Sequence, residues 1–158
     1  MPAITPCLWF DGQAQEAAEL YVALFPNSRV LGTESAPEGT PSPPDGPLTV
    51  EFELDGNRFT GLNGGPQFIF DEAISFQIDC ADQAEVDHYW DGLLVDGGQE
   101  SQCGWLKDRF GVSWQVVPRR LTELLTDADP ERASRAMHAM LTMQRIDIAA
   151  LEAATDAR

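Results

Sequence analysis

The 158-residue sequence predicts an α+β protein made of two copies of a βαβββ unit, followed by C-terminal helices. The first observation behind this prediction is a plan that occurs twice, in which a short apolar strand is followed by a helix and then by further strands. The second is a matched spacing. Asp11 ends the first strand and Tyr21 lies ten residues on, while Asp79 and Tyr89 repeat that spacing 68 residues later. Internal repetition of this kind indicates a duplicated unit.

A proline-rich segment accounts for the difference in length between the two halves. The turn glycines Gly56 and Gly111 are 55 residues apart, about 13 fewer than the offset between the strand ends. The segment 36–47, APEGTPSPPDGP, is close to that length and has no counterpart in the second half. Its five prolines lack the N–H that a sheet ladder needs, so we expect a loop.

In the first half, apolar and alternating runs predict strands at 6–10, 29–33, 48–54 and 58–63. The last two form a hairpin because they flank Asp55-Gly56, a strong turn signal. Between the first two strands, residues 13–25 predict a helix. Its apolar residues recur at i, i+3, i+4 and i+7 on one helical face: Ala17, Leu20, Tyr21 and Leu24.

The second half predicts strands at 74–79, 100–106 and 112–117 and a helix at 81–94. After Pro118 the pattern becomes helical. Asp129-Pro130 is a helix start, with a capping residue before proline at the first helical position. An apolar stripe follows, and residues 146–153 add a further turn or two. The stripe, which we expect to serve packing, is Ala133, Met137, Met140 and Leu141.

We expect one domain over residues 1–158. Module one spans about 4–65, module two about 73–118, and a helical segment 119–158. A hydrophobic content of 43% suffices for a core and excludes a wholly disordered chain.

The negative charge of the chain excludes some classes of binding partner. With 26 acidic and 10 basic residues the formal charge is −16, which repels phosphate backbones and anionic lipid. We therefore expect no nucleic acid and no membrane as partners. The first residues lack both a basic region and a long apolar run, so we expect a cytoplasmic protein. Three cysteines without a CxxC pair indicate reduced thiols, each more typical of a small buried residue than of a nucleophile.

Three long segments resemble one family: CLWFDGQAQEAAELYVALFPNSRV, LNGGPQFIFDEAISFQIDC and QCGWLKDRFGVSWQVVP. They are similar to the PhnB-like branch of the glyoxalase/bleomycin-resistance/dioxygenase superfamily, also called vicinal oxygen chelate proteins. The C-terminal MLTMQRIDIAALEAA looks like the same branch, so the resemblance covers about residues 4–154. Members often carry the label 3-demethylubiquinone-9 3-methyltransferase. The sequence has no glycine-rich strand-to-helix loop for a nucleotide-like methyl donor, so we do not expect methyl transfer.

The resemblance implies paired βαβββ modules that curl into a cup, often within a homodimer, and we expect a homodimer here. Active relatives hold a divalent metal in the cup through His and Glu, and the metal acts as a Lewis acid. The corresponding positions here are near 5–7, near 49–51 or 62–63, near 73–75, and at Gln115. They carry mainly Thr, Pro, Ala, Ser or Ile and one amide, which are poor partners for a hard cation.

We therefore expect no metal and no other cofactor. The two histidines, His88 and His138, fall in predicted helices away from the cup, and Glu51 alone could be a ligand if the register differs by one. What remains is a cup for a small-molecule ligand. Its expected wall is Cys7, Trp9, Asn63, Gln102, Cys103, Trp105 and Gln115.

Three functions stay open from the sequence. The first is metal-free binding of a small molecule that is apolar or aromatic in character. The second is a lyase, isomerase or dioxygenase type of enzyme, either metal-free or with a metal bound in an unexpected register. The metal-free version needs a general base, for which the candidates are Glu51, Asp108 and a thiolate at Cys103. The third is a dimeric scaffold in which Trp9 and Trp105 fill the cup themselves. Trp114 alternates with Gln115, so only one of them can face the cup.

Overall fold

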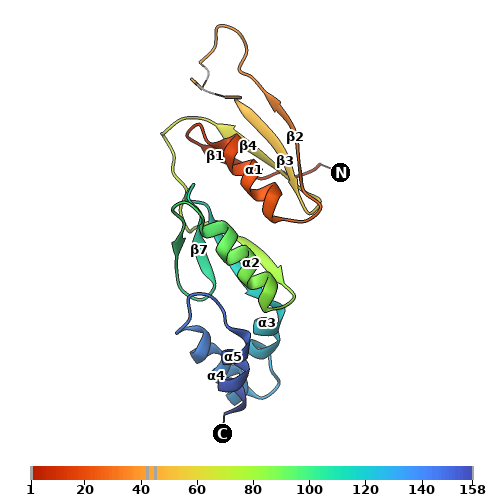
Figure 1. Ribbon diagram of the computed structural model, residues 1–158, viewed down its shortest axis with the longest axis vertical. Coiled ribbons are helices and arrows are strands. Elements are labelled where there is room, and N and C mark those ends of the chain that lie inside the picture. The colour runs from red at the N-terminus through yellow and green to blue at the C-terminus, as the bar shows by residue number, and fades with distance from the viewer. Residues whose placement is uncertain (1, 42, 45, 158) are drawn as a thin grey trace. The chain divides into compact units, whose positions relative to one another are not determined.

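The computed structural model describes residues 2–41, 43–44 and 46–157 (Figure 1). The chain divides into two compact units, unit one over residues 1–70 and unit two over residues 71–158. Each unit contains one βαβββ module, and unit two also contains the C-terminal helices. The predicted α+β class and the duplicated module are confirmed.

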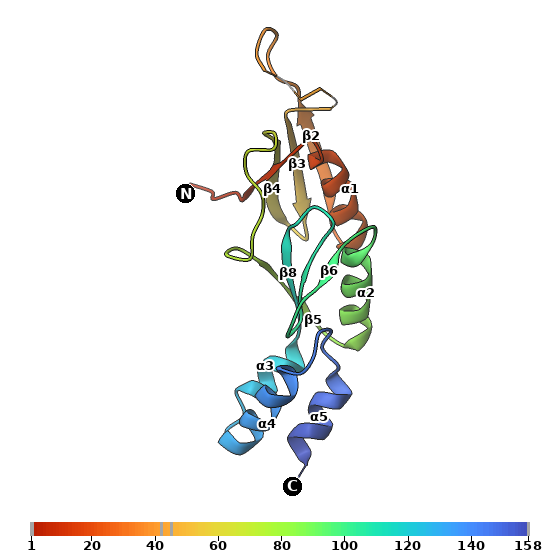
Figure 2. The same cartoon turned by 90° about the vertical axis from the view of Figure 1, so that its left-hand side faces the viewer.

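Unit one is a four-stranded mixed sheet with one helix on one face (Figure 2). Its elements are β1 (Cys7–Phe10), α1 (Ala14–Leu24), β2 (Arg29–Glu34), β3 (Thr49–Leu54) and β4 (Asn57–Asn63). The strand order is β1-β4-β3-β2, with β1 parallel to β4 and the other pairs antiparallel. Asp55-Gly56 forms the predicted hairpin turn, with both residues at positive φ. The described residues of 36–47 form no helix or strand, as expected of a proline-rich loop.

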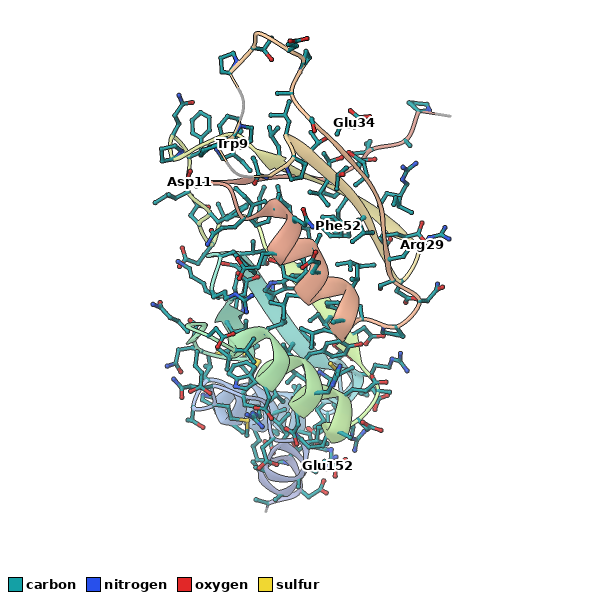
Figure 3. All side chains as sticks on the ribbon, turned by 45° about the horizontal axis from the view of Figure 1, so that its top comes forward. Trp9, Asp11, Arg29, Glu34, Phe52 and Glu152 are labelled. Carbon is teal, nitrogen blue, oxygen red and sulfur yellow. The ribbon has the colours of Figure 1, made fainter. Side chains whose placement is uncertain are left out.

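The core of unit one lies between α1 and the sheet. Strand β3 alternates strictly, with Val50, Phe52 and Leu54 buried and the residues between them only half-buried. Phe52, labelled in Figure 3, packs near the ring of Tyr21 on α1, at 6.2 Å between centroids. The matched tyrosine of the repeat is therefore a core residue, and its partner Tyr89 in unit two is buried as well.

Unit two repeats the arrangement and adds helices. Its sheet contains β5 (Phe76–Cys80), β6 (Gln99–Glu100), β7 (Trp105–Lys107) and β8 (Ser113–Pro118), in the order β5-β8-β7-β6. Helix α2 (Gln83–Leu94) packs on this sheet and is capped by Asp82, which accepts from the N–H of Glu85. The later helices are α3 (Arg119–Leu125), α4 (Pro130–Met140) and α5 (Ile148–Asp156).

One predicted strand is wrong. Residues 100–106 form two short antiparallel strands, β6 and β7, joined by a turn. Cys103 and Gly104 lie at φ +59° and +83°, in a backbone region that breaks a strand. Their N–H groups donate to the carbonyls of Met143 and Gln144, so the loop before α5 holds the turn.

The C-terminal helices share a small core of their own, made of Leu121, Leu124, Ala136, Ile146 and Leu151. Helix α4 starts as predicted, with Asp129 accepting from the N–H of Glu131 and proline at the first position. The apolar stripe is only partly used for packing. Met140 lies against the small core, whereas Met137 and Leu141 are exposed.

Candidate functional site

Each sheet has one face covered by its helix and one turned away from it, which we call the far face. In β8, Trp114 and Val116 are buried toward α2, so Gln115 between them lies on the far face. Trp105 pairs directly with Gln115 across β7 and β8 and shares that face. Of the two neighbours Trp114 and Gln115, it is therefore Gln115 that lies on the far face.

A row of neutral polar groups crosses the far face of unit two. Gln77 on β5 donates from Nε2 to Oε1 of Gln115 at 3.2 Å. Gln115 donates in turn from Nε2 to the hydroxyl of Ser75 at 2.8 Å. Two of the positions that the resemblance assigns to metal ligands, Ser75 and Gln115, are thus in direct contact. Both are uncharged and already bonded to each other.

The far face of unit one carries a different row. Cys7 pairs with Thr60, and Thr60 with Glu51, across β1, β4 and β3. The hydroxyl of Thr60 lies 2.9 and 3.0 Å from the two carboxylate oxygens of Glu51. Partial burial, and after it the charge of Glu51, raise the pKa of the Cys7 thiol. Cys7 is therefore a thiol near neutral pH and a poor nucleophile.

Trp9 also lies on the far face of unit one, where neighbouring residues hold it. Its indole N–H donates to the carbonyl of Gly65 at 2.8 Å, and its ring meets Phe68 edge-on at 4.9 Å. A Cβ added to Gly64 would lie 2.3 Å from the ring, so glycine there allows the close approach. Trp9 thus anchors the segment after β4 as well as covering the sheet.

Three expected wall residues lie elsewhere. Asn63 is on the helix side of its strand, buried, where its Oδ1 accepts from the N–H of Ala14 and its Nδ2 donates to the carbonyl of Pro47. It orients the start of α1 and the end of the proline-rich loop. Gln102 and Cys103 lie in the turn between β6 and β7, so neither is on a strand face. The sequence placed both on one long strand, whereas in the structure they lie in the turn that divides it.

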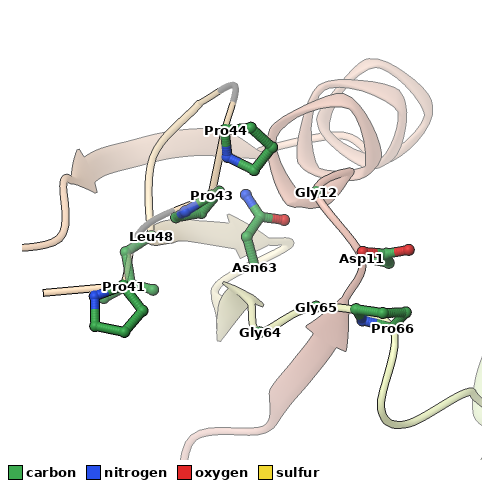
Figure 4. Close-up of a pocket in the computed structure, with 10 residues that line it drawn as sticks. All are labelled: Asp11, Gly12, Pro41, Pro43, Pro44, Leu48, Asn63, Gly64, Gly65 and Pro66. Carbon is green, nitrogen blue, oxygen red and sulfur yellow. The ribbon is translucent and has the colours of Figure 1, made fainter.

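A pocket of about 500 Å³ lies in unit one where the proline-rich loop passes the start of α1 (Figure 4). The polar side chains in its lining are Asp11 and Asn63, and the carboxamide of Asn63 is already committed to two hydrogen bonds. The rest of the lining is apolar or glycine: Gly12, Pro41, Pro43, Pro44, Leu48, Gly64, Gly65 and Pro66. The pocket is large enough for a small molecule but has few polar side chains that could orient one.

A second pocket, of about 140 Å³, lies along β6, β7 and β8 in unit two. It is lined by Glu72, Gln99, Glu100, Ser101, Trp105, Leu106, Lys107 and Ser113. Trp105 was expected at the site. Lys107 and Ser113 were missed, because the pattern Trp-Leu-Lys was placed at the end of one long strand and its alternation was not followed past Leu106.

The described residues offer no cluster of three or more His, Cys, Asp and Glu side chains that could hold a metal ion. His88 is on α2, edge-on to the ring of Tyr89, and His138 is on α4, where Nδ1 lies 2.7 Å from the carbonyl oxygen of Ser134. The donors present therefore do not fit the metal that the resemblance implies.

The candidate bases Asp108 and Glu51 differ in burial and in the hydrogen bonds that their carboxylates accept. Asp108 is buried in the turn between β7 and β8. It accepts from the N–H groups of Phe110 and Val112 and from the indole N–H of Trp114. These bonds stabilise the turn between β7 and β8, so the carboxylate of Asp108 serves the structure. Glu51, half-buried on a far face, keeps the more accessible carboxylate.

No helix in the described part of the chain has the length and apolar character needed to cross a membrane.

Comparisons with known proteins agree with this geometry. The family model described as 3-demethylubiquinone-9 3-methyltransferase matches residues 2–117. The PhnB protein from Bacillus cereus is 29% identical, covers 74% of this chain and 99% of its own, and has a TM-score of 0.68. Protein PA1353 from Pseudomonas aeruginosa is 18% identical over 75% of this chain and 98% of its own, with a TM-score of 0.62, a likeness of fold.

A glyoxylase/bleomycin resistance protein/dioxygenase domain from Frankia sp. EAN1pec is also similar, at 14% identity and a TM-score of 0.43, over 72% of this chain and 94% of its own. No curated protein matches the chain. Since the family model spans well over half of the sequence, the chain belongs to the PhnB-like 3-demethylubiquinone-9 3-methyltransferase domain family.

Proposed function

We propose that this protein binds a small organic molecule without a catalytic metal, on the far face of unit two around Trp105 and Gln115. The observation that carries the proposal is the neutral row Ser75, Gln115 and Gln77. A metal needs ligands that offset its charge, whereas amides and hydroxyls suit the hydrogen-bonding groups of an organic ligand. Trp105 adds a flat apolar surface beside them.

The far face of unit one carries Cys7 and Trp9, two further residues that the sequence assigned to the wall. Methyl transfer, which the family description names, is not part of this proposal. The polar groups described above serve to orient a ligand, and none of them forms a site for a methyl donor.

The metal-free part of the proposal is tested by titration. Protein dialysed against EDTA is titrated with Mn²⁺, Ni²⁺ and Zn²⁺ in a calorimeter, and its thermal midpoint is measured with and without each ion. We expect no saturable binding and no rise of the midpoint. One tightly bound equivalent of any of the three ions would overturn the proposal.

The ligand-binding part is tested with benzamide, a flat neutral probe that carries one amide. Binding is followed by ¹H–¹⁵N NMR shifts, and Gln115→Ala is expected to weaken it by about tenfold, the effect of one hydrogen bond of about 1.5 kcal/mol. Gln102→Ala is the matched control, because Gln102 is an exposed turn residue that the sequence also assigned to the wall. Equal affinity of Q115A and Q102A would place the binding elsewhere.

We also propose that the protein works as a homodimer in the cytoplasm. The segment between β4 and β5 exposes three large apolar residues, Phe68, Ile69 and Ile74, which suit an interface. All three cysteines are free, which fits a reducing compartment. Light scattering after gel filtration is expected to give a mass of about twice 17.3 kDa. Substitution of Ile69 by Asp is expected to give the monomer, and a wild-type monomer at micromolar concentration would contradict the proposal.

A further inference from the structure

The small pocket of unit two is lined by one cationic residue, Lys107, and by the buried Ser113. Lys107 is the single lysine in a chain of charge −16 and lies on β7 directly opposite Ser113 on β8. Ser113 is 1% exposed, and its hydroxyl has no hydrogen-bond partner in the described part of the chain. A buried polar atom without a partner is costly, and one that lines a pocket is suited to a ligand.

The ammonium of Lys107 already holds a carboxylate. Glu72 Oε1 lies 2.5 Å from Lys107 Nζ, and this contact lowers the pKa of Glu72. The side chain of Glu72 is 61% exposed and comes from the irregular segment before β5, so it is held by little else. An exposed ion pair of this kind is weak, and a competing carboxylate can replace it. The contact with Glu72 therefore shows that a carboxylate can bind to the ammonium of Lys107.

The other carboxylate in the pocket lining does not compete for the ammonium. Glu100 accepts a hydrogen bond from the indole N–H of Trp90 at 2.8 Å, and Trp90 lies on α2. Its charge is therefore directed toward the helix side of the sheet. Gln99 and Ser101 are neutral and add hydrogen-bonding groups around Lys107. The negative charge of the whole chain is screened beyond about 8–10 Å at physiological salt, so the local cation governs binding.

The size of the pocket limits what enters it. A volume of about 140 Å³ equals that of four or five water molecules, at about 30 Å³ each. That is room for a carboxylate and a few more atoms. Trp105, which lines the pocket and pairs with Gln115 across the strands, extends the surface for a flat body.

We infer that Lys107 and Ser113 form a carboxylate subsite, and that the ligand is a small flat carboxylic acid whose body lies on Trp105. The acid displaces Glu72 from Lys107, and the hydroxyl of Ser113 turns about χ1 to donate to a carboxylate oxygen. This inference rests on the proposed function, because it assigns one end of the ligand proposed to bind at Trp105 and Gln115.

The test compares benzoate with benzamide, which have nearly the same shape and differ in charge. Benzoate is expected to bind at least about tenfold more tightly, because a charge-assisted bond is about twice as strong as a neutral one. Lys107→Gln is expected to remove that preference, and Lys107→Arg to keep most of it. Ser113→Ala is expected to weaken benzoate by about three- to tenfold.

Glu72→Gln gives a result that a merely structural ion pair would not. Removing the resident carboxylate is expected to tighten benzoate binding by about two- to fivefold, the equivalent of one exposed ion pair, and to leave benzamide unchanged. Arg132→Gln is the control for loss of one positive charge, since Arg132 belongs to α4 and pairs with Asp127 and Asp156. Its affinity for benzoate is expected to equal that of the wild type.

The outcomes separate the two proposals. If benzamide binds with dependence on Gln115 but benzoate binds no better, and K107Q changes nothing, the carboxylate subsite is refuted and the proposed function stands. If benzoate depends on Lys107 but no probe depends on Gln115, the subsite stands and the proposed wall fails. If neither probe binds at millimolar concentration, both are overturned.

Discussion

Replacing Ser113 by alanine is expected to stabilise the protein. The serine is 1% exposed, and its hydroxyl is closed to solvent without a partner among the described residues. A buried hydroxyl in that state costs about 1–3 kcal/mol relative to water. Alanine removes the oxygen and keeps the Cβ and the backbone pairing with Lys107. The space left behind is only that of one oxygen atom.

The free energy of unfolding is therefore expected to rise by about 1–2 kcal/mol, after a few tenths are lost to the weaker strand propensity of alanine. For a chain of this size that corresponds to a midpoint higher by about 2–8 °C. Urea titration, followed by tryptophan fluorescence and far-UV circular dichroism, measures the change. The same variant is expected to bind benzoate less well, so stability and binding would change in opposite directions.

Thr155 provides the matched control. It is also fully buried, but its hydroxyl donates to the carbonyl of Leu151 at 2.7 Å. Thr155→Val keeps the volume, removes a hydroxyl that has a partner, and is expected to lower the free energy of unfolding by about 1 kcal/mol. A loss of 1 kcal/mol or more in S113A as well would show that its hydroxyl has a structural partner, and the reasoning about the subsite would fail with it.

Three further predictions follow from the contacts described above. Asp108→Ala removes the acceptor of three donors, two of them buried, and is expected to destabilise unit two by about 3 kcal/mol, measured by urea titration. Gly64→Ala places a Cβ 2.3 Å from the ring of Trp9 and is expected to cost about 1–3 kcal/mol and to change the near-UV circular dichroism. Glu51→Gln removes a charge that raises the pKa of Cys7 and is expected to quicken its alkylation by iodoacetamide at pH 8 by about two- to fivefold, measured by peptide mass spectrometry.

Each of these has an internal control. For G64A it is Gly32→Ala, because a Cβ there meets nothing within 4 Å, and equal losses for both would rule out the clash. For Cys7 it is Cys80 in the same digest, whose pKa burial raises to about 12 and which is expected to stay unmodified. Unchanged alkylation of Cys7 in E51Q would remove Glu51 as a cause. For Asp108, a loss below 1 kcal/mol would mean that the turn does not depend on it.

The fold was predictable because its signals are local. Alternation in 48–54 and the Asp55-Gly56 turn define the hairpin of unit one, and Asp129-Pro130 defines the start of α4. The turn that divides 100–106 has no such signal. Cysteine rarely adopts positive φ, and the bonds that hold Cys103 and Gly104 come from Met143 and Gln144, about 40 residues away in sequence. Short-range reasoning could not supply those contacts.

The site was predictable only in part, for the same reason. Gln115, Trp105, Cys7 and Trp9, which the sequence assigned to the wall of a cup, lie on the far faces of their sheets. Asn63 could have been excluded, because counting by twos from buried Phe59 puts it on the helix side. The Lys107–Ser113 subsite could not be predicted by counting alternate residues along a strand. Lys107 and Ser113 are neighbours because β7 pairs with β8. Strand β7 begins after the turn at Cys103 and Gly104, which the sequence did not predict.

The far faces of the two sheets carry different chemistry. In unit one the row Cys7, Thr60 and Glu51 contains a carboxylate, and the threonine hydroxyl stabilises its charge. In unit two the row of Gln77, Gln115 and Trp105 contains no charge at all. Duplication gives both sheets the same strand order, whereas the side chains on their far faces differ. A bound cation needs ionic ligands, and this row of unit two offers amides. A neutral or anionic organic ligand needs donors, which unit two supplies through Gln115 and the neighbouring Lys107.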